Sequence, residues 1–361
     1  MTNWITGISE NEWKSKTASG LIANQEAARA AEKVGFKVLS YPRYNSHQMR
    51  EEGWQGRQTR IEGLVAGVKP GDTVIFQYPT WVNNNNFDGQ FIDTIRNIPN
   101  VKIAAYVWDI ISWVHDDRER DYSGDISLWF LSKFNLVMAA NPKIAKRLRT
   151  LGGVKCPIMP LGVTDILYSN TLKERKFLKR LYFTATGINP TMVEDYKAKT
   201  DFYFIGPDWA MKEENGEYKP HPDNFHFLGQ KFTDEIPAIY EGGFGVVAYG
   251  RGGVYPGMVK YGEYNNPMKL SQYIASGLPP IVRSNSAHAG WVKEQNIGLV
   301  IDDLNEIDEI LDKMTEADYR QILENLRPWQ QAVSRGHFAQ RACLEAVRIM
   351  RLGYVDGLSE I

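Results

Sequence analysis

A lysine in the first turn of an expected helix is the clearest candidate for binding an anion in this sequence. Residues 242–282 run from an apolar strand through a glycine-rich loop to Asn265, Asn266 and Pro267, and a helix follows. Pro267 suits the first helical turn, either asparagine can cap it, and Lys269 lies in that turn. Free N–H groups, the positive end of the helix dipole and an ammonium suit a pyrophosphate. An ordinary loop-helix-strand unit with a solvated lysine is an equally weighted alternative.

A second candidate for chemistry is Asp109, a carboxylate at the end of an expected strand. It follows the apolar run 101–108, and residues just after the strands of a parallel sheet face its ligand-binding edge. Asp109 is therefore a candidate general base, although the pattern alone favours a helix N-cap. Trp81 and Trp108 lie at equivalent strand ends, where their rings could stack on a ring-shaped ligand.

The remaining polar clusters and signatures exclude several classes of site. Four acidic residues within 116–121 could hold a divalent cation, but the interleaved Arg118 and Arg120 favour a solvated loop, so we predict no metal site. Nucleotide-fold glycine fingerprints, phosphate loops, zinc-protease motifs and nucleophile elbows are all missing from the sequence. The missing motifs argue against four classes of enzyme: nicotinamide dehydrogenases, phosphate-loop nucleotidases, zinc proteases and α/β-hydrolases.

Composition narrows the class of protein further. The 42 Lys and Arg residues balance 43 Asp and Glu residues, and no basic block occurs, so we expect no nucleic-acid partner. Two cysteines exclude a disulfide framework. We expect a cytoplasmic protein without a transmembrane segment, because neither a signal peptide nor a run of about 18 apolar residues is present. Aromatic residues make up 12% of the chain and are expected mainly in the core.

Alternating strand and helix patterns must position these residues. Short apolar runs predict strands at 37–41, 72–77, 101–108, 136–140, 180–184, 201–205, 224–228, 244–249, 280–283 and 299–302. Amphipathic segments predict helices at 22–34, 49–68, 87–96, 126–134, 142–151, 316–331 and 337–352. This alternation predicts an α/β protein with doubly wound parallel sheets.

The length of 361 residues predicts about two domains at ~150 residues each. The pattern breaks at 156–164, which holds two prolines and a glycine, and a charged run at 173–180 follows. We therefore predict two Rossmann-like domains, one at 1–160 and one at 161–335. A C-terminal helix at 336–361 is expected to pack back toward the first domain. The cleft between the domains would hold the ligand.

The segment YNNPMKLSQYIASGLPPIV at 264–282 resembles a segment of bacterial β-1,6-galactofuranosyltransferases. It is similar, more loosely, to the glucosyltransferases that extend the O-glycan of serine-rich repeat adhesins. Residues 63–81, 225–247, 296–325 and 335–347 have counterparts in the same order. The resemblance therefore covers most of the chain.

This resemblance implies a GT-B glycosyltransferase with an interdomain cleft and a UDP-sugar donor, without a metal or another cofactor. The Rossmann-like domain at 1–160 would then be the acceptor side, and the one at 161–335 would bind the nucleotide sugar. Lys269 would contact the donor pyrophosphate, Thr17 would approach the donor from the first domain, and Gly206 would lie by the base pocket. The donor-binding residues implied are Thr17, Gly187, Gly206, Glu263, Asn265, Asn266 and Lys269.

The sequence departs from the family pattern at two places. Relatives usually carry His-Asp where this chain has Trp108-Asp109, and an arginine is absent from residues 186–191. We expect transfer of galactofuranose or glucose from a UDP-sugar to a glycan or glycoprotein, with Asp109 as the base. A non-catalytic nucleotide-sugar-binding subunit is the alternative. By family likeness we expect a homo-oligomer, and a peripheral membrane association is compatible with the sequence.

Overall fold

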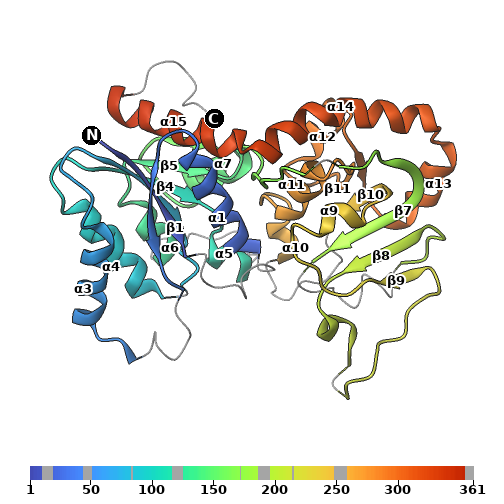
Figure 1. Ribbon diagram of the computed structural model, residues 1–361, viewed down its shortest axis with the longest axis horizontal. Helices are drawn as coiled ribbons and strands as arrows, with labels where there is room; N and C mark the ends of the chain where they lie inside the picture. Colours follow the sequence, from blue (N-terminus) through green and yellow to red (C-terminus); the bar gives the residue numbers. More distant parts are fainter. Residues whose placement is uncertain are drawn as a thin grey trace.

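The computed structural model describes residues 1–9, 19–43, 51–82, 84–115, 125–170, 172–185, 196–213, 215–247 and 258–353. These residues form two α/β halves that lie side by side (Figure 1). Each half is built on one six-stranded parallel sheet. The predicted doubly wound α/β class is confirmed.

The N-terminal sheet has the strand order β2-β1-β3-β4-β5-β6. Its strands are β1 (Asn3–Ile8), β2 (Lys37–Tyr41), β3 (Thr73–Tyr78), β4 (Lys102–Val107), β5 (Leu136–Ala139) and β6 (Ile158–Pro160). The helices of this half are α1 (Ser19–Glu32), α3 (Trp54–Val65), α4 (Asn85–Arg96), α5 (Ile111–His115), α6 (Ile126–Leu131) and α7 (Pro142–Thr150).

The C-terminal sheet has the order β12-β11-β10-β7-β8-β9. Its strands are β7 (Lys176–Thr184), β8 (Asp201–Ile205), β9 (Phe225–Phe227), β10 (Gly242–Val246), β11 (Pro280–Arg283) and β12 (Leu299–Ile301). The helical segments that follow along the chain are η2 (Asp208–Met211), α9 (Ile236–Ile239), α10 (Met258–Tyr261), α11 (Met268–Ala275), α12 (Ala289–Glu294), η3 (Leu304–Glu306), α13 (Ile307–Lys313), α14 (Glu316–Arg335) and α15 (His337–Leu352).

Both strand orders contain a point where the direction of winding reverses. In the N-terminal sheet this switch point lies between β1 and β3, and in the C-terminal sheet it lies between β7 and β10. Ligands of open α/β sheets bind outside the carboxyl ends of the strands at such points. We therefore expect ligand-binding residues just after β1, β3, β7 and β10.

Two apolar layers cover each sheet, which explains why its strands are continuous apolar runs. All six residues of β3 and all four residues of β5 are buried. Much of the aromatic surplus lies in these layers, since Trp113, Tyr106, Phe76 and several other large rings are fully buried. The high aromatic content is therefore largely a property of the core.

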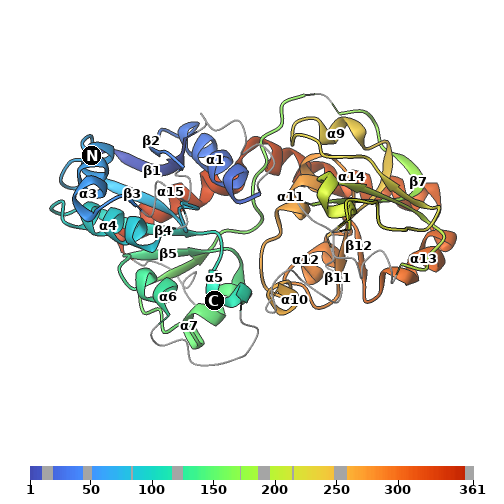
Figure 2. The ribbon, with the colours of Figure 1, turned by 90° about the horizontal axis from the view of Figure 1, so that it is seen from below.

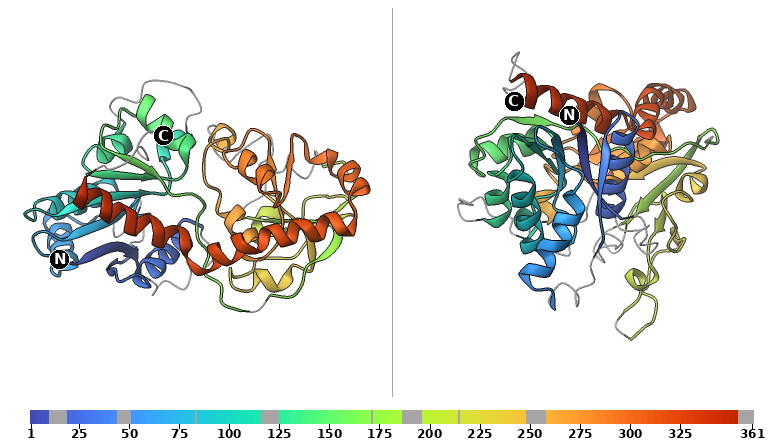
Figure 3. Two further views of the ribbon diagram at one scale, coloured as in Figure 1. Left: turned by 90° about the horizontal axis from the view of Figure 1, so that it is seen from above. Right: turned by 60° about the vertical axis from the view of Figure 1, so that its left-hand side comes forward.

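The last helix returns to the N-terminal half. Helix α14 ends at Gly336, whose φ of 84° reverses the chain, and α15 then packs against α1 and β5. Figure 3 shows α14 and α15 running across both halves. The carboxylate of Asp165 accepts hydrogen bonds from the backbone N–H groups of Phe338 (3.2 Å) and Ala339 (2.6 Å) at the start of α15. This contact fastens the connecting segment, residues 161–170 after β6, to the returning helix.

The structure differs from the sequence prediction at two strands of the N-terminal sheet. Strand β1 was not among the predicted strands, although its last four residues are buried. Strand β6 lies inside the predicted break at 156–164, where it pairs with β5 at the edge of the sheet. Prolines are tolerated at a sheet edge, so they are not evidence against a strand there. The predicted domain limits at 160 and 335 stay predictions.

Candidate functional site

Asp109 lies at the contact between the two halves. Strand β4 ends at Val107, and Asp109 follows one residue before Ile110 and the short helix α5. Its Oδ1 atom accepts a hydrogen bond of 2.5 Å from the hydroxyl of Tyr261, which belongs to α10 in the C-terminal half. The N–H group of Ile110 donates to the same hydroxyl at 3.3 Å. Helices α5 and α10 lie side by side, as Figures 1 and 2 show.

The environment of Asp109 favours its protonated form more than water does. Burial raises the pKa of this carboxyl to about 6, and the hydrogen bond from Tyr261 opposes the rise. The residue as a whole is half-buried. A carboxylate with a pKa just below neutrality is suited to accept a proton.

Trp108 is held by a buried amide rather than left free to rotate. Its Nε1 donates to Oε1 of Gln77 at 3.0 Å, and Nε2 of Gln77 donates to the carbonyls of Thr6 (2.5 Å) and Asn24 (2.9 Å). The indole also packs against the ring of Tyr106, with centroids 4.6 Å apart. The residue before Asp109 is thus an aromatic ring in a fixed orientation.

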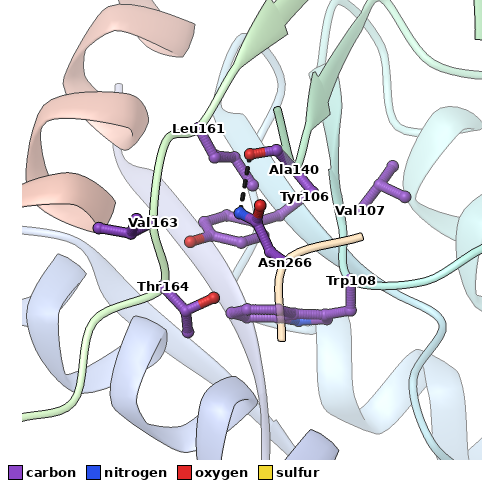
Figure 4. A pocket seen from close by; sticks show the side chains of 8 residues that line it. All are labelled: Tyr106, Val107, Trp108, Ala140, Leu161, Val163, Thr164 and Asn266. Carbon is purple, nitrogen blue, oxygen red and sulfur yellow. Dashed lines mark hydrogen bonds between the residues drawn. The ribbon is translucent and has the colours of Figure 1, made fainter. Parts of the chain in front are cut away.

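A small cavity of about 10 Å³ lies beside Trp108, where the two halves meet. Figure 4 shows the amide of Asn266 reaching toward the carbonyl of Ala140 next to the rings of Tyr106 and Trp108. About one water molecule fits in this volume. The cavity is too small for a sugar.

Trp81 follows β3 at the switch point of the N-terminal sheet. Its φ of 60° is in the left-handed region, and its indole lies against Gly20, where an added Cβ would come within 2.7 Å of the ring. Glycine is therefore needed at position 20. The hydroxyl of Thr80 donates to the buried carboxyl of Asp88, whose pKa burial raises to about 7. These contacts fix the turn that presents Trp81.

Lys269 lies at the switch point of the C-terminal sheet. It occupies the first turn of α11, after Pro267, and its ammonium lies 5.0 Å from the centroid of the Phe183 ring. Phe183 is next to the last residue of β7. The structure therefore places a lysine and a helix N-terminus at the carboxyl end of the strand where a ligand is expected.

The two asparagines before this helix have different surroundings. Nδ2 of Asn266 donates to the carbonyls of Ala140 (2.8 Å) and Gly162, and its Oδ1 accepts from Asn141 at 3.0 Å. Asn266 therefore connects the two halves with its whole amide group. Oδ1 of Asn265, in contrast, is buried without a hydrogen-bond partner among the described residues.

Glu263 lies at the start of the same segment, at the contact between the halves. Its carboxylate pairs with Lys260 at 2.8 Å and accepts a long hydrogen bond of 3.4 Å from Asn285. Its backbone carbonyl accepts from Lys143 on α7 at 3.3 Å. Glu263 is partly exposed, so its carboxylate is accessible to a ligand.

Gly206 follows β8 and is packed closely. A Cβ at this position would lie 2.2 Å from the ring of Phe204 and 2.6 Å from the carbonyl of Ala185, so a side chain does not fit. Thr17 and Gly187 lie outside the described residues, as do the acidic cluster at 116–121 and the glycine-rich stretch 248–257.

A larger cavity of about 400 Å³ lies between α1, the connecting segment, α9 and α11. Polar side chains of both halves line it, among them Gln25, Arg29, Asp234 and Gln272. None of the predicted site residues that the structure describes lines this cavity. In the described part of the chain, no group of three or more His, Cys, Asp or Glu residues could hold a metal ion, and no helix is long and apolar enough to span a membrane.

The residues that hold the candidate base and its neighbour could not be found from the sequence. The local pattern predicts a loop at Tyr261 and the end of a strand at Gln77. Neither has a local sequence signal, because their partners lie 152 and 31 positions away in the chain. The contact of Asp109 with α10 also differs from the helix cap that the local pattern favoured.

Two doubly wound sheets with candidate groups at their switch points define the chain as having the GT-B fold of nucleotide-sugar glycosyltransferases. Sucrose-phosphate synthase from Thermosynechococcus elongatus shares this fold with a TM-score of 0.63 at 13% identity, over 98% of this chain and 99% of that one. Anabaena HepE, solved in complex with UDP and glucose, has a TM-score of 0.57 at 8% identity, over 96% and 99%.

Sequence comparison then places the chain in a family. The N-terminal domain of the glucosyltransferase 3-like family matches residues 2–163 and its C-terminal domain matches residues 181–346, so the chain belongs to that family. It is 25% identical to glucosyltransferase 3 of Streptococcus gordonii over 91% of this chain and 94% of the relative. It is 23% identical to the β-1,6-galactofuranosyltransferase WbbI of Escherichia coli K12, over 80% and 83%. The resemblance inferred from the sequence and the predicted glycosyltransferase class are confirmed.

Proposed function

We propose that this chain transfers a hexosyl group from a UDP-sugar to a hydroxyl group of a glycan or glycosylated protein. The observation that carries the proposal is the placement of Lys269 and Asp109. Lys269 lies at the switch point of one sheet, and Asp109 follows a strand of the other sheet, where it contacts α10. A cation for the leaving group and a base for the acceptor are thus offered from the two halves.

Lys269 would stabilise the departing diphosphate. Negative charge grows on the phosphate oxygen as the bond to the sugar breaks, and a fixed ammonium with the free N–H groups of α11 lowers the energy of that state. Glu263 and Asn265 precede this helix and are proposed to contact the donor, with Gly206 beside the base. Thr17, Gly187 and Asn266 complete the proposed donor site.

Asp109 would take the proton of the acceptor hydroxyl during a direct displacement. Trp108 and Trp81 are proposed to stack on the sugar or acceptor. Trp108 cannot replace a histidine in proton transfer, since its indole N–H is a donor only and is bound to Gln77. Proton transfer is therefore assigned to Asp109 alone.

We propose no resident metal or other cofactor, because Lys269 and the helix end supply positive charge to the diphosphate. Transfer assayed with excess EDTA should then keep its rate within about twofold, by the reasoning that no cation takes part in charge stabilisation. Loss of transfer in EDTA, restored by a divalent ion, would contradict this assignment.

Glucose and galactofuranose are the two proposed sugars, since relatives named for each cover most of the chain. A glycan or glycosylated-protein acceptor and a homo-oligomeric assembly are parts of the proposal that follow from the family likeness. A cytoplasmic location, with peripheral association with a membrane, is proposed as well.

A thermal-shift panel of nucleotides and nucleotide sugars tests the donor class. A ligand that binds the folded state raises stability by about 2.7 kcal/mol at a concentration of 100 Kd. We expect UDP to raise the melting temperature more than ADP and GDP do, and one of UDP-glucose and UDP-galactofuranose to exceed the other. Equal responses to all nucleotides would contradict the proposal.

The alternative function is a nucleotide-sugar-binding subunit without activity of its own. The observation that favours it is Trp108, which occupies the position of the histidine in relatives. Product formation from the preferred UDP-sugar in the presence of glycan acceptors decides between the two. Stabilisation by UDP without turnover of any donor would support the binding subunit.

A further inference from the structure

Tyr261 belongs to one half of the molecule but is buried in the other. It lies on α10, after the fourth strand of the C-terminal sheet, yet it is 3% exposed and packs in the apolar core of the N-terminal half. Tyr264 is 5% exposed and is buried in the same core. The segment that carries both tyrosines is therefore docked on the opposite half.

The hydroxyl of Tyr261 is used in two hydrogen bonds there. It donates to Oδ1 of Asp109 at 2.5 Å and accepts from the N–H group of Ile110 at 3.3 Å. The backbone bond fixes the direction in which the hydroxyl can donate. The other carboxylate oxygen, Oδ2, has no recorded hydrogen bond with a described residue.

Other charged and titratable groups near this contact are directed elsewhere. The ring of Tyr264 lies 5.3 Å from that of Tyr261, edge to face. The guanidinium of Arg147 on α7 lies 5.0 Å from the centroid of the Trp113 ring and 4.8 Å from that of the Tyr264 ring. Lys143, also on α7, donates to backbone carbonyls of the C-terminal half. Among the described residues, the phenol is therefore the group that holds the carboxylate.

We propose that Tyr261 is a positioning residue for Asp109. Its hydroxyl binds Oδ1 of Asp109 from the opposite half and leaves Oδ2 to take the proton of the acceptor. This inference rests on the proposed function. It implies that the base is completed only when α10 is docked on the N-terminal half. The hydrogen bond also favours the ionised form of the carboxyl, which is the form that accepts a proton.

In the step that this arrangement serves, the acceptor oxygen forms a bond to the anomeric carbon of the donor sugar. The bond from that carbon to the diphosphate oxygen breaks, and UDP leaves with the electron pair. The acceptor proton moves to Oδ2 of Asp109, while the proton of Tyr261 stays on the phenol. Tyr261 does not touch the reacting atoms.

The pH dependence of kcat/KM for transfer tests this role in the Tyr261→Phe variant. Loss of one hydrogen bond to a charged group is expected to move the acid limb of the profile upward by about one pH unit. Tyr264→Phe is the matched control, since it removes a hydroxyl from the same wall, and its acid limb should match that of the wild type. Stabilisation by UDP in each variant shows that it is folded.

A second variant decides the question even if Tyr261→Phe does not fold. Fluorotyrosine at position 261 is a more acidic donor, so the limb should move to lower pH. An acid limb that stays at its wild-type pH in the folded variants would overturn the role of Tyr261. The proposed transfer function would still stand. Absence of any UDP-sugar turnover by the wild type would instead overturn the proposed function.

Discussion

At the scale of single residues, Lys269 is the group on which donor binding should depend most. Lys269→Ala removes the ammonium at the carboxyl end of β7 but leaves the helix N-terminus in place. We expect the Kd for UDP to rise by about tenfold and turnover to fall by about 10²-fold, since charge stabilisation matters more as the diphosphate departs.

Calorimetric titration with UDP and steady-state transfer assays measure these two effects. Lys293→Ala is a matched control, because Lys293 is an exposed lysine on α12. Unchanged UDP affinity and unchanged turnover in Lys269→Ala would remove Lys269 from the site.

The environment of Asp109 predicts a pH profile for the wild type. Burial raises its pKa to about 6, and a general base works only when it is ionised. Transfer should therefore fall as pH drops through about 6 and decrease about tenfold per unit below it. Measurement of kcat/KM between pH 4.5 and pH 8 (~0.5-unit steps) checks the position of this limb. A rate independent of pH across this interval would contradict a carboxylate base.

At the scale of elements, the connecting segment and α15 are held together by Asp165. Its buried carboxylate binds two N–H groups in the first turn of α15, so Asp165→Ala should destabilise the protein by about 1–2 kcal/mol. Scanning calorimetry measures the change. Asp223→Ala, at an exposed position, should stay within about 0.5 kcal/mol of the wild type. Equal melting temperatures in the two variants would contradict this role.

Elements that carry a continuous apolar run or a regular apolar stripe could be predicted from the sequence. Strand β8 lies at the predicted residues, and α15 begins and ends as its apolar stripe predicts. Strand β6 could not be predicted, because its three residues carry no periodic pattern and their role as a strand comes from pairing with β5. Helix α3 is shorter than the predicted helix at 49–68, since residues 52, 53 and 66–68 are not helical.

The candidate site was predicted only in part, for a related reason. Lys269 could be placed at a helix N-terminus because Pro267 is a local signal. The predicted asparagine cap is wrong, since Pro267 itself is the N-cap residue and no side chain of a described residue caps α11. The bond between Asp109 and Tyr261 could not be predicted, because it joins elements 152 positions apart. The sequence predicts Asn266 at the donor. Its hydrogen bonds to Ala140 and Gly162 could not be predicted, because these residues lie 126 and 104 positions away in the chain.

At the scale of the whole molecule, the two halves are joined through the segment that contains α10 and the loop before α11. Asn141, which caps α7, donates to a carbonyl of this segment, and Lys143 on α7 donates to carbonyls of this segment and of residues 285–286. Tyr261 and Tyr264 of the segment are buried in the opposite core. Tyr261, which binds the proposed base Asp109, and Lys269 thus lie close together in the chain, and both halves contact the segment between them. A transfer between two substrates requires this relative placement of the two groups.

The central claim is that Asp109 is the base of a UDP-dependent hexosyl transfer, and one variant tests it most directly. Single-turnover transfer by Asp109→Asn should be slower by about 10²-fold or more, since an amide cannot accept the proton. UDP affinity should remain that of the wild type, because the proposed diphosphate site lies at Lys269 in the other half. A full wild-type rate in Asp109→Asn would contradict the account.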